Sequence, residues 1–229
     1  MRRKDKTTIA KIKTFAPLSF PLRLCVKYFS TPRALNDYAT HVPVLIGLAR
    51  MREIKSVLEF GCGYYSTLTF LNRTAFPHLE RLHTVENDVS WSETINEVAK
   101  VDERWILQLV KGEIAGCVTK LDLESFDLIL IDDSKTSTQR AATIRRIAAE
   151  QPQRPWIAIH DFEVEEYREA ASGFKYRRRF RAYNPETGVV ANRLNEWNMI
   201  ERVIKAKAKL LDPAAVAPWI ESFRQDLPD

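Results

Sequence analysis

The chain has 229 residues, of which 45% are hydrophobic and 28% are charged, and its formal net charge is +5 at pH 7. This length and balance exclude a disordered or fibrous protein and are typical of one globular domain. The 7 glycines and 11 prolines follow no fixed period, which excludes a repeat architecture. No stretch of about 18 consecutive apolar residues is present, so the sequence predicts no membrane-spanning helix.

The cysteines Cys25, Cys62 and Cys117 are odd in number and widely separated, which fits neither a disulfide framework nor a CxxC metal site. The N-terminal residues also lack the apolar segment and the cleavage site of a secretory signal. We therefore expect the protein in the cytoplasm, where cysteines stay reduced.

The first 33 residues differ from the rest of the chain in charge. Residues 1–33 carry nine basic side chains and one acidic one, a local charge of +8 that leaves −3 for residues 34–229. Such a segment is suited to an anionic membrane surface or a phosphate backbone, although a solvated leader explains the composition equally well. We expect residues 1–30 to form a basic N-terminal extension, with peripheral membrane association as one alternative. The chain has no motif specific for nucleic acid and none for an oligomeric state.

The sequence after residue 31 predicts short helices followed by strands that alternate with helices. Two short helices are expected over residues 32–40 and 43–52, because Thr31 can cap a helix that begins at Pro32 and Pro43 interrupts it. The predicted strands are Ser56–Phe60, Arg81–Glu86, Trp105–Val110, Phe126–Ile131 and Trp156–His160. The helices expected among them and after them are Ser90–Lys100, Thr138–Glu150 and Glu163–Ser172.

Strands that alternate with helices form βαβ units, which require a parallel sheet covered by helices on both faces. The segments Phe174–Tyr183 and Gly188–Arg193 flank a turn and predict an antiparallel hairpin. Further helices are expected over residues 194–225. The predicted fold class is therefore α/β, with a doubly wound, mostly parallel seven-stranded sheet, a C-terminal antiparallel hairpin and helices on both faces. Residues 31–229 make one domain around a core at 55–193.

The first predicted strand runs into a turn with two glycines. The ligand crevice of a doubly wound sheet lies beyond the carboxyl ends of its strands. Gly61 and Gly63 let the backbone approach a ligand there, and Ser66 or Thr67 can cap the next helix, whose N-terminus favours a polar group. Glu59 precedes the turn, where a carboxylate would repel a pyrophosphate and attract an amino group.

A second acid closes the second predicted strand. Glu86 follows Gly61 by 25 residues, and a carboxylate at this place can accept both hydroxyls of a ribose. Together with Glu59 it indicates a nucleoside cofactor that carries an amino acid instead of phosphates. An NAD-dependent oxidoreductase is the alternative, disfavoured by Glu59 and by Ser66, which stands where GxGxxG has its third glycine.

These residues resemble the class I S-adenosylmethionine-dependent methyltransferases. The family's acid-x-Gly-x-Gly motif is matched by the acid and the two glycines named above, and its ribose-binding acid is matched by Glu86. The resemblance covers about residues 45–193, and Tyr65 replaces a further glycine, as in a small-molecule branch of the family. It implies that S-adenosylmethionine is the cofactor, that Glu113 lies near the adenine, and that a small-molecule acceptor is methylated, at oxygen.

Acidic residues and a histidine follow the fourth and fifth predicted strands. His160 is the candidate base, because the ordinary pKa of an imidazole is near neutrality. Asp132 and Asp161 are the candidate ligands of Mg²⁺, an arrangement that resembles the catechol-type O-methyltransferases, but Phe162 stands where those enzymes have asparagine. Alternatively, Asp132 orients the cofactor and Asp133 caps the next helix.

The end of the fourth predicted strand indicates which acceptors are disfavoured. It lacks the Asn/Asp-Pro-Pro-Tyr signature, which argues against methylation of nucleic-acid bases at exocyclic amines. His41 can help to roof the acceptor pocket, although a lone histidine beside a proline is more often structural. Finally, the chain can be a non-catalytic cofactor-binding scaffold that is tethered by its basic N-terminal segment.

Overall fold

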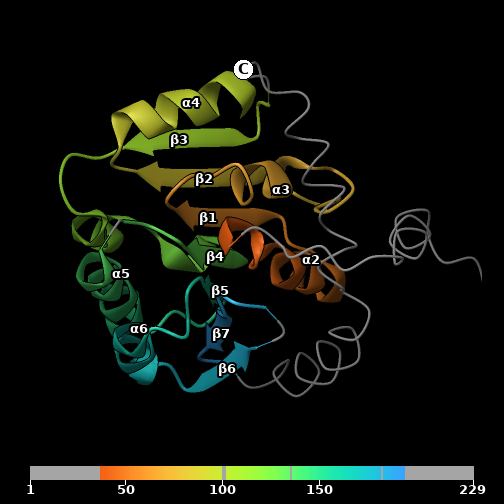
Figure 1. Cartoon of the computed structure of the whole chain (residues 1–229). Helices are drawn as coiled ribbons and strands as arrows, with labels where there is room; N and C mark the ends of the chain where they lie inside the picture. Colours follow the sequence, from red (N-terminus) through yellow and green to blue (C-terminus); the bar gives the residue numbers. More distant parts are fainter. Residues whose placement is uncertain (1–36, 100–101, 135, 182, 194–229) are drawn as a thin grey trace, which may run out of the picture.

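The computed structural model describes residues 37–99, 102–134, 136–181 and 183–193. They form one seven-stranded sheet with the strand order β3-β2-β1-β4-β5-β7-β6 (Figure 1). The predicted basic extension and the helices predicted over 194–225 lie outside the described residues.

Five parallel strands come first along the chain, and an antiparallel hairpin closes one edge of the sheet. The strands are β1 (Ser56–Phe60), β2 (Arg81–Glu86), β3 (Trp105–Leu109), β4 (Leu128–Ile131), β5 (Trp156–Ile159), β6 (Tyr176–Phe180) and β7 (Thr187–Ala191). β1 lies between β2 and β4, and β7 runs antiparallel to both β5 and β6. The predicted fold class and its hairpin are confirmed.

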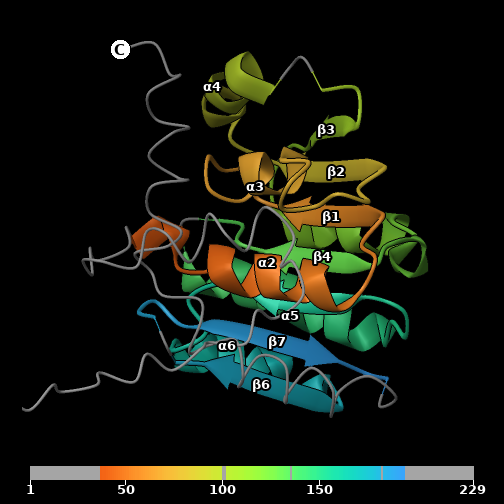
Figure 2. The ribbon, with the colours of Figure 1, turned by 90° about the vertical axis from the view of Figure 1, so that its right-hand side faces the viewer.

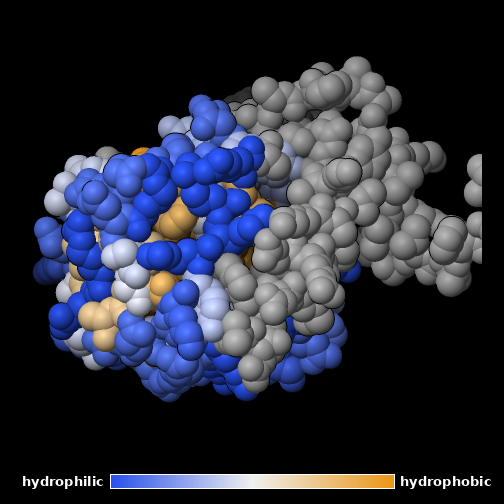
Figure 3. All heavy atoms as spheres, turned by 90° about the horizontal axis from the view of Figure 1, so that it is seen from below, coloured by the Kyte–Doolittle hydropathy of each residue, from blue (hydrophilic) through white to orange (hydrophobic). Residues whose placement is uncertain are grey.

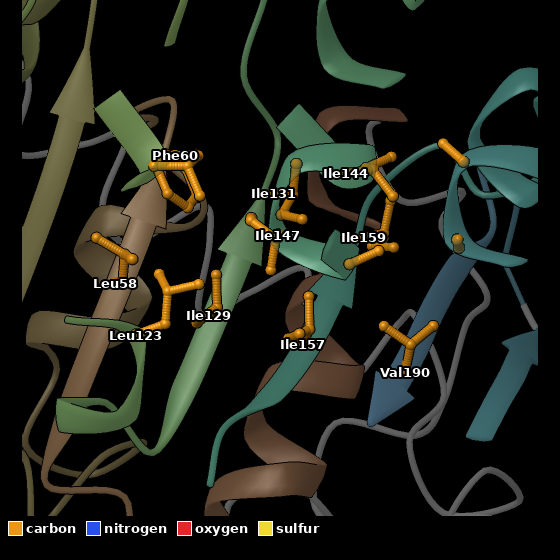
Figure 4. Packing of buried hydrophobic residues seen from close by; sticks show 14 of the residues in the cluster. Leu58, Phe60, Leu123, Ile129, Ile131, Ile144, Ile147, Ile157, Ile159 and Val190 are labelled. Carbon is orange, nitrogen blue, oxygen red and sulfur yellow. The ribbon is translucent and has the colours of Figure 1, made fainter. Parts of the chain in front are cut away.

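Strand residues alternate between two apolar clusters, one on each face of the sheet. In β4, Leu128 and Leu130 belong to one cluster, whereas Ile129 and Ile131 belong to the other, which is shown in Figure 4. All residues of this strand are buried. A side chain of this kind contributes roughly 1.5–3 kcal/mol when it is removed from water. Burial on both faces explains why the strand sequence is continuously apolar rather than alternating.

Helices cover both faces, as Figure 2 shows, with α2, α3 and α4 on one side and α5 and α6 on the other. The α-helices are α2 (Val42–Met51), α3 (Thr67–Leu71), α4 (Val89–Ala99), α5 (Ser137–Glu150) and α6 (Glu165–Ala170). The 3₁₀ turns are η1 (Asp37–Ala39), η2 (Ile114–Lys120), η3 (Leu123–Ser125) and η4 (Ala171–Gly173). The predicted helix over 43–52 corresponds to α2, whereas the described part of 32–40 forms only the 3₁₀ turn η1.

The beginning of α5 corrects one expectation. Its N-cap is Thr136, whose side chain accepts a hydrogen bond from the backbone N–H of Gln139. Asp133 is instead completely buried, and its Oδ2 accepts a hydrogen bond from Thr143 Oγ1 at 2.7 Å. Asp133 therefore packs under α5 and does not cap it.

Where described residues form the outer surface at the β6 end of the molecule, that surface is mostly hydrophilic (Figure 3). No helix in the described part of the chain combines the length and apolar character that a bilayer crossing requires.

Candidate active site

A cavity of about 1260 Å³ lies beyond the carboxyl ends of β1, β2 and β4. Its wall is formed by the turn after β1, the loop between β2 and α4, the end of β4 with the start of α5, and the segment before α2. Ligand pockets for one small molecule commonly measure about 300–1,000 Å³. The cavity therefore has room for a cofactor together with a second small molecule.

The turn after β1 depends on its first glycine. Gly61 has a φ of 85°, and its N–H donates to the Val85 carbonyl at 2.9 Å. A β-carbon at this position would lie 2.5 Å from the carbonyl oxygen of Asp132, so only glycine fits. A β-carbon at Gly63 would meet the Ser66 hydroxyl at 3.2 Å, which is a milder restriction.

A buried carboxyl holds the same turn from beneath. Oε2 of Glu59 accepts hydrogen bonds from Thr67 Oγ1 at 2.8 Å and Thr84 Oγ1 at 2.7 Å, and Thr67 Oγ1 accepts from the N–H of Gly63 at 3.0 Å. Burial raises the pKa of Glu59 to about 7. Glu59 is 0% exposed and is not part of the cavity wall, whereas Ser66 lies on the wall and makes no capping hydrogen bond through its side chain.

Glu86 lies at the cavity wall with its carboxylate held by backbone donors. Its Oε1 accepts from the N–H groups of Asn87 and Asp88 at 2.7 and 2.8 Å, and its Oε2 accepts from the N–H of Cys62 at 3.0 Å. Trp91 Nε1 donates to the Cys62 carbonyl at 2.7 Å, which ties α4 to the glycine turn. The carboxylate is therefore fixed in orientation beside the cavity.

Glu113 is placed differently from the other predicted cofactor residues. It is exposed, immediately before η2, and it does not belong to the cavity wall. The structure thus brings Gly61, Gly63, Ser66 and Glu86 together around the cavity, whereas Glu59 lies buried beneath the glycine turn and Glu113 lies outside the wall.

The ends of β4 and β5 carry a compact polar cluster centred on an arginine from α5. Arg140 Nη2 lies 2.9 Å from Asp132 Oδ1, and Arg140 Nη1 donates to Asp161 Oδ2 at 2.6 Å. His160 Nδ1 lies 3.2 Å from the same Asp132 oxygen, and His160 Nε2 lies 2.9 Å from Thr40 Oγ1. The three predicted catalytic residues therefore meet, but each already has a protein partner.

The electrostatics of this cluster favour the charged forms of His160 and Asp132. Burial alone would lower the pKa of His160, but the neighbouring Asp132 carboxylate outweighs burial and raises that pKa. Burial alone would raise the pKa of Asp132, but His160 and Arg140 together hold it below its ordinary value. His160 is 3% exposed and lies behind the cavity wall, so the predicted base faces its partners and not the cavity.

Asp132 and Asp161 do not fit the Mg²⁺ that the sequence suggested. The guanidinium of Arg140, itself only 8% exposed, already forms an ion pair with each of these carboxylates. A hard divalent cation needs several oxygen ligands and water, and it would be repelled by this guanidinium. The group of His41, Asp132 and His160 has ligand atoms within 4.8 Å of one another, but it shares the same Asp132 and therefore the same repulsion.

His41 is the imidazole that forms part of the cavity wall. It is 1% exposed, and neither of its ring nitrogens has a hydrogen-bond partner among the described residues. Its ring lies edge-on to that of His160, with centroids 4.7 Å apart. Burial, together with the adjacent His160, lowers the pKa of His41 to about 3.

No family model matches this chain, and no curated protein matches it. Solved structures do match. The cofactor-bound protein Rv0187 from MTB is 17% identical, with a TM-score of 0.51 over 76% of this chain and 88% of its own. A putative O-methyltransferase from Nostoc punctiforme PCC 73102 is 13% identical, with a TM-score of 0.48 over 74% of this chain and 66% of its own.

The N-methyltransferase NodS from Bradyrhizobium japonicum WM9, in complex with S-adenosyl-L-homocysteine, is 12% identical, with a TM-score of 0.47 over 74% of this chain and 96% of its own. The sheet order, with an antiparallel β7 inserted between β5 and β6, is the seven-stranded order expected of a class I S-adenosylmethionine-dependent methyltransferase fold. The chain therefore has the fold of the class I S-adenosylmethionine-dependent methyltransferases.

Proposed function

We propose that this protein transfers a methyl group from S-adenosylmethionine to a small-molecule acceptor, at oxygen. The observation that carries the proposal is the acidic wall of the cavity beside the glycine turn. Glu86, Asp88 and Asp132 lie on this wall, whereas Arg140, its one basic residue among those described, is paired with carboxylates. Such a wall attracts a sulfonium nucleoside with an ammonium group and repels the pyrophosphate of NAD.

Each residue near the turn has a role in this proposal. Glu86 would accept the ribose hydroxyls, because its carboxylate lies on the wall in a fixed orientation. Gly61 and Gly63 would let the backbone approach the cofactor. Glu59 would act indirectly, because it holds the turn through Thr67 and does not reach the cavity.

Asp132 would serve the reacting end of the site. Its pKa lies below the ordinary range, so the carboxylate stays ionised next to the cavity. Bound S-adenosylmethionine supplies a methyl group on a positively charged sulfur. The protein then has to orient the acceptor in line with that group and to accept its proton.

Transfer to oxygen is favoured by two features of the chain. An acceptor hydroxyl must lose a proton, and the cavity wall offers a neutral imidazole, His41. The residues after β4, Asp132-Asp133-Ser134, differ from the Asn/Asp-Pro-Pro-Tyr signature of enzymes that methylate base amines. Association of residues 1–33 with an anionic surface stays a prediction.

Calorimetry on the full chain tests cofactor choice. We expect saturable binding of S-adenosylhomocysteine and none of NAD, because the cavity wall is acidic. Glu86→Ala should weaken S-adenosylhomocysteine binding by about 10- to 100-fold, as expected for a lost hydrogen bond to a charged group. Glu80→Ala, at an exposed glutamate outside the wall, is the control and should bind normally. Binding of NAD alone would overturn the proposal.

A further inference from the structure

We propose that His41 is the catalytic residue that receives the acceptor's proton, and that His160 is a positioning residue behind it. This inference rests on the proposed function, because it assigns a residue within the same site. It also names the acceptor class, a hydroxyl compound with an apolar body.

The backbone around His41 is fixed from two sides. The His41 carbonyl accepts the N–H of Leu45 at 3.0 Å in the first turn of α2, where Pro43 presets the helical conformation. The preceding residue, Thr40, contacts His160 Nε2 at 2.9 Å and so joins this segment to the end of β5. The imidazole is therefore held at the cavity wall by a helix and a strand.

The ring nitrogens of His41 indicate that a bound molecule forms a hydrogen bond with this side chain. Buried polar atoms almost always have a hydrogen-bond partner, and leaving one without a partner is costly. Both nitrogens of His41 lack one among the described residues, although the side chain is buried and lies on the cavity wall. A bound molecule that donates an O–H to one nitrogen would satisfy this group.

The surroundings shift the pKa values of the two neighbouring imidazoles in opposite directions. The charged or titratable groups that act on His41 are His160, Asp132 and Arg140. Burial, His160 and Arg140 lower the pKa of His41, and only Asp132 opposes them. The pKa of His160 is raised by the same Asp132. Two similar groups with divergent pKa values are typical of separate roles, and here the neutral one lies at the cavity.

The proposed step forms one oxygen–carbon bond and breaks one carbon–sulfur bond. A lone pair of the acceptor oxygen forms the new bond to the methyl carbon, the carbon–sulfur bond breaks with its electron pair left on sulfur, and the hydroxyl proton moves to a ring nitrogen of His41. A weakly basic imidazole suffices, because an oxygen that is being alkylated is far more acidic than the starting hydroxyl. The ionised Asp132 then stabilises the new charge on His41.

The surroundings of His41 indicate the shape of the acceptor. Tyr38 and Tyr65 lie on the same cavity wall, and Tyr65 packs against the apolar cluster that contains Val42. Tyr38 is 73% exposed, so an apolar surface borders the opening of the cavity. Aromatic walls favour an acceptor with an apolar or aromatic body, such as a phenol.

Nuclear magnetic resonance of ¹⁵N-histidine in the full chain tests the site without turnover. We expect the His41 ring to be neutral at pH 7 and its nitrogens to shift when phenol is added to protein saturated with S-adenosylhomocysteine. Glu80→Ala, at an exposed glutamate outside the cavity wall, should leave this response unchanged. A His41 ring that is protonated at pH 7, or one that does not respond to phenol, would overturn the inference.

Turnover of labelled S-adenosylmethionine with fractionated phenolic metabolites supplies the second test. His41→Ala should bind S-adenosylhomocysteine normally but lose about 100- to 10,000-fold in rate, as expected for a lost proton acceptor, and added imidazole should restore part of it. His41→Gln, which keeps the volume, should be equally slow. The control His83→Gln alters a histidine that contacts Gln108 and lies outside the wall.

The outcomes separate the two proposals. If the natural protein does not bind S-adenosylhomocysteine, the proposed function fails. If it binds and methylates, and His41→Ala is fully active, the inference alone fails. Loss of activity on chelation of metals, together with metal binding that His41→Ala abolishes, would replace proton acceptance by metal ligation and also overturn it.

Discussion

The turn after β1 places the α-carbon of Gly61 against the backbone of Asp132 and Asp133, directly after β4. This contact joins the glycine turn to Asp132, so the cofactor end and the reacting end of the candidate site share one rigid support. The N–H of Gly63 is fixed in turn by Thr67, which Glu59 holds from the core. Residues that never reach the cavity thus determine its shape.

Gly61→Ala should disrupt this support. The new β-carbon would lie 2.5 Å from the Asp132 oxygen at a φ of 85°, so we expect a loss of about 2 kcal/mol or more in the free energy of unfolding. Urea denaturation measures this loss. Gly116→Ala is the control, because a β-carbon there meets nothing within 4 Å. Equal stability of the two variants would contradict the contact.

At the scale of elements, the sequence predicts those strands and helices that a local pattern of residues determines. β4 is a continuous apolar run, and its neighbours in the sheet end within a residue or two of the predicted positions. The role of Arg140 was not predictable in this way. The residue lies inside a correctly predicted helix, but its bond to Asp161 joins positions 21 residues apart and depends on how α5 crosses the strand ends. A sequence that does not reveal the contacts of Arg140 therefore predicts a metal between Asp132 and Asp161, where the structure has a guanidinium.

His160 and His41 also depend on a contact between distant segments that no local sequence pattern predicts. Both histidines are candidates from the sequence, and the end of the fifth predicted strand predicts the neighbourhood of His160. Which imidazole faces the cavity depends on Thr40, whose hydroxyl covers His160 Nε2. That contact spans 120 residues, and no local pattern encodes it.

The opposite end of the sheet is held by one buried acid. Asp127 Oδ2 accepts the backbone N–H groups of Lys55 and Ser56 at 2.9 and 3.0 Å, and its Oδ1 lies 2.8 Å from Arg154 Nη2. Because Asp127→Ala would leave two backbone donors without their acceptor, one of them at the buried Ser56, we expect a loss of about 3 kcal/mol in the free energy of unfolding.

Thermal and urea denaturation of Asp127→Ala measure the loss. Glu80→Ala, which removes an exposed partner of Lys55, should have no measurable effect. If both variants unfold like the natural protein, the β1–β4 junction does not depend on this carboxylate.

At the scale of the whole molecule, buried ionisable groups make stability depend on pH in opposite directions. The pKa of Asp127 is lowered, so its contribution is present above the ordinary pKa and is lost as the pH falls. The lowered pKa of His41 acts in the same direction, because the folded protein keeps this ring neutral. Glu59 and Asp133, whose pKa values are raised to about 7 and about 6, stabilise less as the pH rises.

Glu59→Gln isolates one of these contributions. In the unfolded chain Glu59 ionises near its ordinary pKa of 4.5, whereas burial keeps it protonated in the folded protein up to about 7. Its stabilisation is therefore complete below pH 4.5 and declines until about pH 7, by about 3 kcal/mol in all. Glutamine keeps an acceptor for Thr67 and Thr84 and cannot ionise, so the stability of the variant relative to the natural protein should rise over this interval.

Urea denaturation at a series of pH values measures the difference. The contribution of Asp133 is common to both proteins and cancels in the comparison. Glu80→Gln, at an exposed glutamate, should give a difference that does not change with pH. A constant difference for Glu59→Gln as well would mean that Glu59 is ionised in the folded protein. The acid beneath the glycine turn would then add a negative charge to the candidate site, and would not support the turn as a neutral hydrogen-bonding group.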